Sequence, residues 1–164
     1  SPYRWLGEGM IAGVPVPVIL MLLILGLTHF ILSFTPLGSY IYAIGGNEET
    51  ARLSGVKVNR IKSIVYLISG LYTGISGLIL AGRLGSAQPN TGEGFELDAI
   101  AAVVLGGTSL MGGRGSVWGT LIGVFIIGIL NNGFNLLNVS PFYQLIAKGI
   151  VIIFAVLLDQ ILKR

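Results

Sequence analysis

Charged side chains are scarce in this sequence of 164 residues, because Asp, Glu, Lys and Arg together make up 10% of it. A soluble domain usually carries about 25% charged residues. Hydrophobic residues make up 53% of the chain, and its mean hydropathy is +0.85. A chain so poor in charge cannot cover its surface with groups that water solvates. The composition therefore excludes a soluble enzyme and indicates an integral membrane protein.

Cysteine is absent, and so is any arrangement of side chains typical of catalysis. Without cysteine the chain has no disulfide framework and no thiolate metal site, and its redox compartment stays open. No pair of carboxylates, His/Asp cluster or nucleophile turn suggests an active site. The glycine-rich stretch 106–115 (GGTSLMGGRG) lacks the GxxxxGK[ST] pattern of a phosphate-binding loop. We therefore expect no enzyme activity, metal or cofactor here, so that any ATP would be hydrolysed by another chain.

The start of the chain carries no secretory signal. It begins at Ser1 without a methionine, and no basic segment precedes a short apolar core. Residues 1–10 (SPYRWLGEGM) are typical of a loop entering a helix. We expect the chain to be a fragment, or the tail of a longer protein.

Long hydrophobic runs are what the sequence has in abundance. A transmembrane helix needs about 20 apolar residues, because each adds about 1.5 Å toward roughly 30 Å of hydrocarbon. The segments that meet this length are 14–34, 63–82, 116–138 and 142–162. A fifth apolar segment, 98–111, is short, and is either a re-entrant half-helix or a short span buried among its neighbours. The sequence thus predicts an all-α integral membrane protein, a single domain over 1–164 with a bundle of about five transmembrane helices.

The positions of Lys and Arg predict the orientation, because cytoplasmic loops of membrane proteins are enriched in them. If 98–111 crosses the membrane, seven basic residues fall on one side: Arg52, Lys57, Arg60, Lys62, Arg114, Lys163 and Arg164. Only Arg4 and Arg83 fall on the other side, and Lys148 lies inside a span. We therefore predict five spans, with the N-terminus outside and both the loop 35–62 and the C-terminus in the cytoplasm. If 98–111 dips and returns, the later spans invert and this bias weakens.

The cytoplasmic loop 35–62 is predicted to contain a helix of about two turns outside the membrane. Asn47 is a good N-cap, and the acidic residues after it lie where the helix dipole favours anions. Gly55 is placed to end the helix in a left-handed conformation. A helix this short is marginal in water, so it is either a solvated connector or a rigid element that docks on a cytosolic partner. The residues predicted to couple the loop to such a partner are Asn47, Glu48, Glu49, Ala51, Arg52, Leu53, Ser54 and Gly55.

Two stretches separated by one predicted span carry a resemblance to a known family. Residues 43–62 (AIGGNEETARLSGVKVNRIK) look like the cytoplasmic coupling loop of ribose-type and other monosaccharide permeases of ATP-binding-cassette (ABC) importers. Residues 96–124 (ELDAIAAVVLGGTSLMGGRGSVWGTLIGV) resemble the most characteristic part of that family. The resemblance runs over essentially the whole chain in the same order, including IAKGIVIIFAVLLDQ near its end.

The resemblance implies that the chain is the C-terminal half of a permease subunit in the bacterial inner membrane. It also implies partners: a second permease copy, cytosolic ABC ATPase subunits and a periplasmic or extracellular substrate-binding protein, besides membrane lipid and without nucleic acid. The function expected is the membrane-spanning part of an ATP-driven, binding-protein-dependent importer for a monosaccharide such as ribose. Two alternatives stay open: a branched-chain amino-acid or nucleoside permease of the same superfamily, and a non-transporting truncated permease or membrane scaffold.

Small residues recur at four-residue spacing in two predicted spans, as they do where membrane helices approach closely. In 63–82 they are Ser69, Thr73, Gly77 and Ala81, with Gly70 and Gly74 beside them. At the start of 116–138 they are Gly115, Gly119 and Gly123. We interpret both sets as helix-packing surfaces.

Amide side chains gather in the outer half of 116–138, near one helical face that holds Gly128, Asn131, Asn132, Asn135 and Asn138. Amides that face lipid are costly, so these groups face other helices or a wet cavity. They either form hydrogen bonds between helices or line a path for a polyhydroxylated solute, since amides both donate and accept. The candidates for such a translocation path are Asn131, Asn132 and Asn135.

The remaining polar candidates lie near the predicted outer ends of the helices. Lys148, about two turns into the last span, either snorkels outward or faces a solute or partner. The loop 83–97 carries Glu93 and Glu96, which are either solvated or contact the binding protein. Asp98 is placed to cap the short apolar helix.

Overall fold

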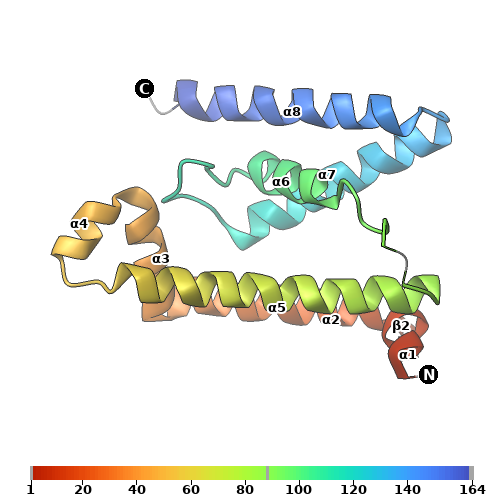
Figure 1. The fold of residues 1–164 in the computed structure, drawn as a ribbon, viewed down its shortest axis with the longest axis horizontal. Helices are drawn as coiled ribbons and strands as arrows, with labels where there is room; N and C mark the ends of the chain where they lie inside the picture. The colour runs from red at the N-terminus through yellow and green to blue at the C-terminus, as the bar shows by residue number, and fades with distance from the viewer. Residues whose placement is uncertain (1, 88, 163–164) are drawn as a thin grey trace. The chain divides into compact units, whose positions relative to one another are not determined.

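The computed structural model of this chain describes residues 2–87 and 89–162. Helix dominates this part of the chain (Figure 1). Its only strands are β1 (Met10–Ile11) and β2 (Val14–Pro15), which pair as a short antiparallel hairpin. The prediction of an all-α membrane fold is therefore confirmed. The helices form two compact units, which are described in turn.

The first unit consists of the chain up to Ile41 together with Glu48–Thr91. Its helices are α1 (Pro2–Glu8), α2 (Val16–Phe34), the first part of α3 (Pro36–Gly46), α4 (Glu48–Leu53) and α5 (Val58–Leu84). α1 packs against the end of α5, where a Cβ on Gly7 would clash with the backbone of Gly82 and Arg83. This tertiary contact stabilises α1, a helix that lies within residues 1–10, where a loop was expected.

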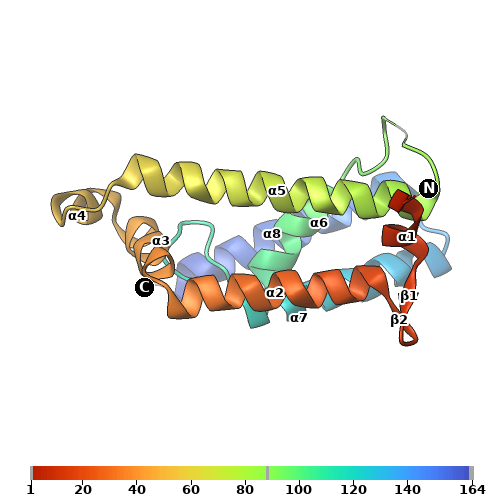
Figure 2. The same ribbon diagram turned by 90° about the horizontal axis from the view of Figure 1, so that it is seen from below.

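α2 and α5 are the two candidate membrane helices of the first unit, and both run along its length (Figures 1 and 2). Thr28 Oγ1 of α2 and Tyr72 Oη of α5 lie 2.9 Å apart and share a hydrogen bond. α2 begins at Val16 rather than at 14, because Val14 and the following proline form β2. α5 begins at Val58 rather than at 63, and this valine is buried.

α3 is a helix that the sequence analysis did not predict. It follows a break at Thr35, whose backbone is extended (φ −117°, ψ 153°). Pro36 takes the first position of the new helix, where its missing N–H and fixed φ are favourable. Gly38 then lies so close to the backbone of Leu32 that a Cβ would clash with it. The proline thus ends one helix and starts another.

The second unit consists of Tyr42–Asn47, at the end of α3, and the chain from Gly92 onward. Its helices are α6 (Phe95–Leu105), α7 (Val117–Leu136) and α8 (Pro141–Leu162). The core between them is formed by Ala101, Ala102 and Ile127, with Leu105 and Ile152 packed against it. Ser116 caps α7, because its Oγ accepts a hydrogen bond of 2.9 Å from the Gly119 N–H.

Small residues form the α6–α7 contact, as predicted. A Cβ on Gly119 would clash with the carbonyl of Gly106, and a Cβ on Gly123 would clash with the carbonyl of Ala102. The small-residue face of α5 differs, because Gly70, Gly74 and Gly77 have no such neighbour within 4 Å among the described residues. Packing on that face of α5 stays a prediction.

Within residues 2–87 and 89–162, four helices are long and apolar enough to cross a membrane: α2, α5, α7 and α8. α6 has 11 residues and is only roughly 16 Å long at 1.5 Å per residue. It ends at Leu105, so the glycine-rich half of the predicted fifth segment is a loop. Five spans and their orientation therefore stay predictions, and Lys163 and Arg164 lie outside the described residues.

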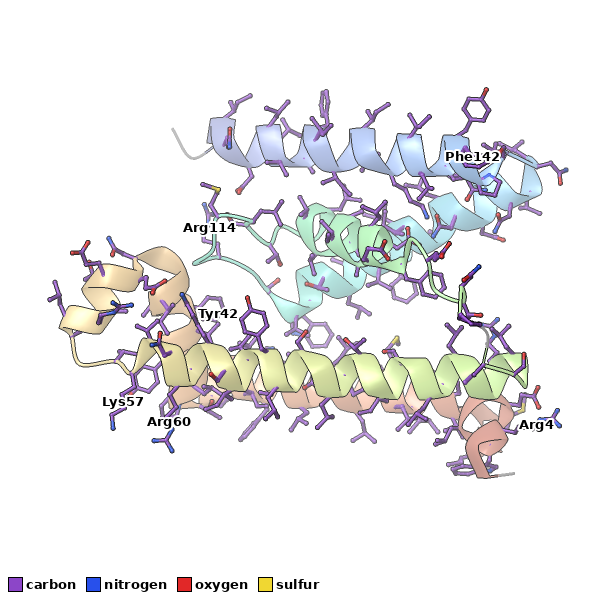
Figure 3. All side chains as sticks on the ribbon, in the orientation of Figure 1. Arg4, Tyr42, Lys57, Arg60, Arg114 and Phe142 are labelled. Atoms are coloured by element: carbon purple, nitrogen blue, oxygen red, sulfur yellow. The ribbon has the colours of Figure 1, made fainter. Side chains whose placement is uncertain are left out.

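Basic residues mark both ends of the first unit. Lys57 and Arg60 lie at the start of α5, and Arg4 lies at the opposite end of this unit (Figure 3). The predicted orientation requires this separation, since it places Arg4 outside and the other two in the cytoplasm.

Candidate functional site

The predicted cytoplasmic helix is α4, and its end follows from Gly55. Gly55 has φ of +89°, in the left-handed region that favours glycine. The Gly55 N–H donates to Arg52 O at 3.0 Å, and the Val56 N–H donates to Ala51 O at 3.1 Å. This pair of bonds is a Schellman motif, which satisfies carbonyls at the helix end. The helix stop predicted at Gly55 is confirmed.

Ion pairs hold α4 onto the beginning of α5. Glu48 accepts hydrogen bonds from Arg52 at 3.0 Å, within α4, and from Lys62 at 2.5 Å, on α5. The Lys62 ammonium, with a smaller effect of Arg52, holds the pKa of the Glu48 carboxyl below its usual value. Both pairs are accessible to solvent, which screens them. Together with the buried Ala51 side chain they keep a helix of this length folded.

The residues predicted to couple this loop to a partner divide into a buried and an exposed set. Ala51 is 5% exposed, so its side chain packs inside the loop and offers no contact surface. A bulky residue at Ala51 would therefore disturb α4 itself before it could affect a partner. Leu53 is 84% exposed, so its apolar side chain is accessible to a partner. The exposed members of the set are Asn47, Glu49, Arg52, Leu53, Ser54 and Gly55.

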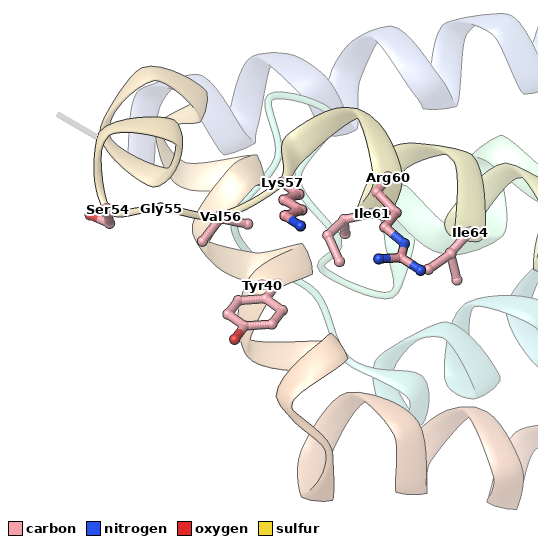
Figure 4. A pocket seen from close by; sticks show the side chains of 8 residues that line it. All are labelled: Tyr40, Ser54, Gly55, Val56, Lys57, Arg60, Ile61 and Ile64. Carbon is pink, nitrogen blue, oxygen red and sulfur yellow. The ribbon is translucent and has the colours of Figure 1, made fainter.

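A cavity of about 490 Å³ opens beside α4 (Figure 4). Its walls combine the apolar side chains of Val56, Ile61 and Ile64 with Tyr40 from α3. Basic side chains at the start of α5 also line the cavity, and Figure 4 shows Arg60 alongside Ile64. An apolar floor with a basic edge suits a protein side chain better than a small polar solute.

The glycine-rich loop 106–115 is clamped to the last turn of α3, which leads directly into α4. Tyr42 Oη donates to Gly115 O at 2.9 Å. Gly45 touches the backbone of Gly112 and Gly113, so that a Cβ on Gly45 or Gly112 would clash, and a Cβ on Gly113 would lie tight against the backbone of Gly46. Gly112 and Gly113 also have positive φ, +88° and +78°. The loop has a defined conformation, although no pattern in the sequence indicated this contact.

A buried serine fixes the same loop to α8. Ser109 is 6% exposed, and its Oγ donates to Asp159 Oδ2 at 2.8 Å. The same Oγ accepts from the Met111 N–H at 3.2 Å, and the Ser109 N–H donates to Arg114 O at 2.9 Å. The sequence analysis missed this pair. A carboxylate within an apolar segment, as at Asp159, was the signal that could have found it.

A second polar cluster joins α6, α7 and α8. Lys148 Nζ lies 2.5 Å from Asp98 Oδ1, and the two side chains are 13% and 22% exposed. Asn131 Nδ2 donates to Asp98 Oδ2 at 2.9 Å. Lys148 therefore does not snorkel outward, because it pairs with a carboxylate on another helix. Asp98 does not cap α6 either, since the helix begins at Phe95.

The other amides of α7 are not brought into this cluster. Asn132 and Asn135 are exposed within the described chain, and Asn135 Oδ1 accepts from Gln144 Nε2 at 3.3 Å. Asn138 lies beyond α7 with φ of +52°, and a second Schellman motif forms around it. Asn138 thus ends the helix and is not part of its polar face. Hydrogen bonding between helices is confirmed for Asn131 and Asn135.

The two glutamates of the predicted outer loop have different surroundings. Glu96 lies in the first turn of α6, and its Oε2 accepts from the Gly94 N–H at 3.1 Å. Glu93 is exposed and lines a cavity of about 200 Å³. Asp98 and Lys148 line the same cavity, so it opens onto the partly buried ion pair.

The sequence of this chain is similar to those of known permeases. The family described as the permease component of branched-chain amino acid transport systems matches residues 3–156. The chain is 58% identical over 158 residues to the ribose import permease protein RbsC of Bacillus subtilis, covering 96% of this chain and 49% of that protein. It is 56% identical over 158 residues to RbsC of Escherichia coli K12, with the same coverage.

A xylose permease is also similar. The chain is 51% identical over 152 residues to the xylose transport system permease protein XylH of Escherichia coli K12, covering 93% of this chain and 39% of XylH. The chain thus spans about half the length of the ribose permeases it matches, and less of the xylose permease. No solved structure matches it.

Proposed function

This chain belongs to the permease family of branched-chain amino acid transport systems, and from this premise we propose that it is the C-terminal half of a permease for a monosaccharide such as ribose. The similar ribose and xylose permeases favour a sugar over an amino acid, although the family is named for amino acids. Each of these relatives extends well beyond the region matched here, so the whole transport activity belongs to a longer protein.

The proposed setting is the inner membrane of a bacterium, with the C-terminus in the cytoplasm. α2, α5, α7 and α8 cross it as full spans, and α6 crosses as a short span among its neighbours. The proposed partners are cytosolic ABC ATPase subunits that hydrolyse the ATP, a second permease copy and a substrate-binding protein outside. Glu93 and Glu96 are proposed to face that binding protein, because they precede and begin α6 at the predicted outer end.

The observation that carries this proposal furthest is the geometry of α4. A transmitted force requires a rigid element, and α4 is fixed by the Glu48 ion pairs and the Gly55 stop. It also needs an exposed apolar group to bury in the partner, and Leu53 is such a group. We propose that Leu53 inserts into a groove of the ATPase, with Glu49 and Arg52 at the rim.

The test is co-purification of the ATPase with the full-length permease carrying Leu53→Glu. We expect loss of the ATPase from the purified complex, because a charge would replace a buried apolar contact. Leu84→Glu is the matched control, since Leu84 is 52% exposed and lies at the other end of α5. A normally bound ATPase and full uptake in the Leu53 variant would show that α4 is only a connector.

A further inference from the structure

The ion pair between α6 and α8 is placed where a packing role explains it poorly. Lys148 is the eighth residue of α8, roughly 10 Å from its start, and so lies within the thickness of a membrane. Charges at such depth are costly even when paired, and apolar residues of similar size usually stabilise a fold as well or better. An ionisable pair inside a membrane protein is therefore expected to act on a solute or ion.

The cluster has hydrogen-bonding capacity to spare. Within the described chain, Asn131 Oδ1 is buried and receives no hydrogen bond. Asp98 Oδ1 faces the Lys148 ammonium at 2.5 Å and Asp98 Oδ2 accepts from Asn131, so each carboxylate oxygen has one partner. A lysine ammonium carries three donors, and a carboxylate has about four acceptor positions. A ligand with several hydroxyl groups could use both at once.

The cavity beside the pair has the size and lining for a small polar solute. Its volume is about 200 Å³, below the range of about 300–1,000 Å³ typical of drug-sized ligands. One part of its lining is charged or carries an amide: Asp98, Lys148, Glu93 and Gln144. The apolar wall is formed by Phe95 and Leu145. This combination suits a sugar, whose hydroxyl groups lie at its edge and whose C–H groups form its faces.

The charge balance favours a neutral solute over an amino acid. Asp98 and Lys148 already neutralise each other, so a polyol can bind between them without leaving a charge unpaired. A zwitterionic amino acid would have to break the Asp98–Lys148 ion pair before its own ammonium and carboxylate could pair with these two side chains. We propose that Asp98 and Lys148, with Asn131 holding Asp98 in place, form a subsite that binds hydroxyl groups of the transported sugar. This proposal rests on the proposed function and adds Asp98 and Lys148 to the predicted path.

The test measures whether a sugar protects the cavity from a thiol reagent. Leu145→Cys, which lines the cavity, is introduced into the full-length permease within its importer, in a background without other cysteines. Ile146→Cys is the control, because Ile146 is 58% exposed on the same helix and does not line the cavity. We expect ribose to slow the reaction of a small water-soluble methanethiosulfonate with the L145C thiol several-fold and to leave the I146C thiol unchanged. Leucine should protect neither thiol.

The charge-neutral double variant Asp98→Asn with Lys148→Met separates binding from structure. It removes the charges together, so a purely structural pair should tolerate it. We expect the importer to assemble and to lose both ribose protection of the L145C thiol and most ribose uptake. The subsite would be overturned by any of three results: ribose uptake without protection of the L145C thiol, ribose uptake that survives the double variant, or protection of the thiol by leucine instead of ribose. Absence of any sugar uptake by the unmodified importer would contradict the proposed function itself.

Discussion

Gly123→Ala tests the close approach of α6 and α7. A Cβ on Gly123 would clash with the carbonyl carbon and oxygen of Ala102. Overpacking costs about 1–3 kcal/mol where side chains can yield. Here the neighbour is backbone, and the nearby contact of Gly119 with Gly106 holds the same two helices together. We therefore expect a loss of about 3 kcal/mol in the free energy of unfolding.

Gly128→Ala is the control in the same helix. A Cβ on Gly128 would meet nothing within 4 Å among the described residues, so a methyl group fits there. Alanine is favoured over glycine in helices by up to about 1 kcal/mol. The two variants should then differ by about 4 kcal/mol, or roughly a thousandfold in the unfolding equilibrium.

The assay is unfolding of the detergent-solubilised full-length permease by increasing sodium dodecyl sulfate, followed by circular dichroism. The transition of Gly123→Ala should occur at a lower detergent fraction than that of the unmodified protein, and the transition of Gly128→Ala at the same or a higher fraction. Equal transitions for the two variants would refute the backbone contact between α6 and α7.

Three further predictions concern the loops. Gly55→Val should lower the free energy of unfolding by at least about 1–2 kcal/mol, because a side chain is strained in the left-handed region. This variant should also bind the ATPase more weakly, whereas Gly55→Asn should bind it normally; equal binding by both variants would contradict the helix stop. Gly113→Ala should impair uptake more than Gly107→Ala, because both have positive φ but only Gly113 touches backbone of another segment; equal uptake would remove the clamp from the mechanism. Because Lys62 lowers the pKa of Glu48, the α4–α5 ion pair should be fully formed above the usual glutamate pKa and should be lost as the pH falls through the lowered pKa of Glu48. Hydrogen exchange of α4 measured against pH should show this loss, and the same pH dependence in Lys62→Gln would contradict it.

Local signals were enough to predict several elements from the sequence. The four long apolar runs correspond to helices, since each holds enough consecutive apolar residues. Gly55 was predicted as a helix stop because glycine tolerates the conformation that a Schellman motif requires. Gly119 and Gly123 were predicted to pack because small residues at this spacing let helix backbones approach.

Contacts between distant segments were beyond local signals. The pairing of Asp98 with Lys148 joins residues on different helices, so no spacing within one helix could reveal it. The same holds for the contact of Gly45 with the glycine-rich loop. α3 was missed because Pro36 was not considered as a helix start, although proline favours the first position of a helix.

If this chain is part of an ATP-driven sugar permease, as proposed, reconstituted transport should show it. The full-length permease, its ATPase and its binding protein are placed in liposomes, and the accumulation of radiolabelled ribose is measured with and without ATP. We predict that ribose accumulates above its external concentration only when ATP is present, and that leucine does not accumulate. Accumulation of leucine in place of ribose, or ribose entry that is the same without ATP, would contradict the account.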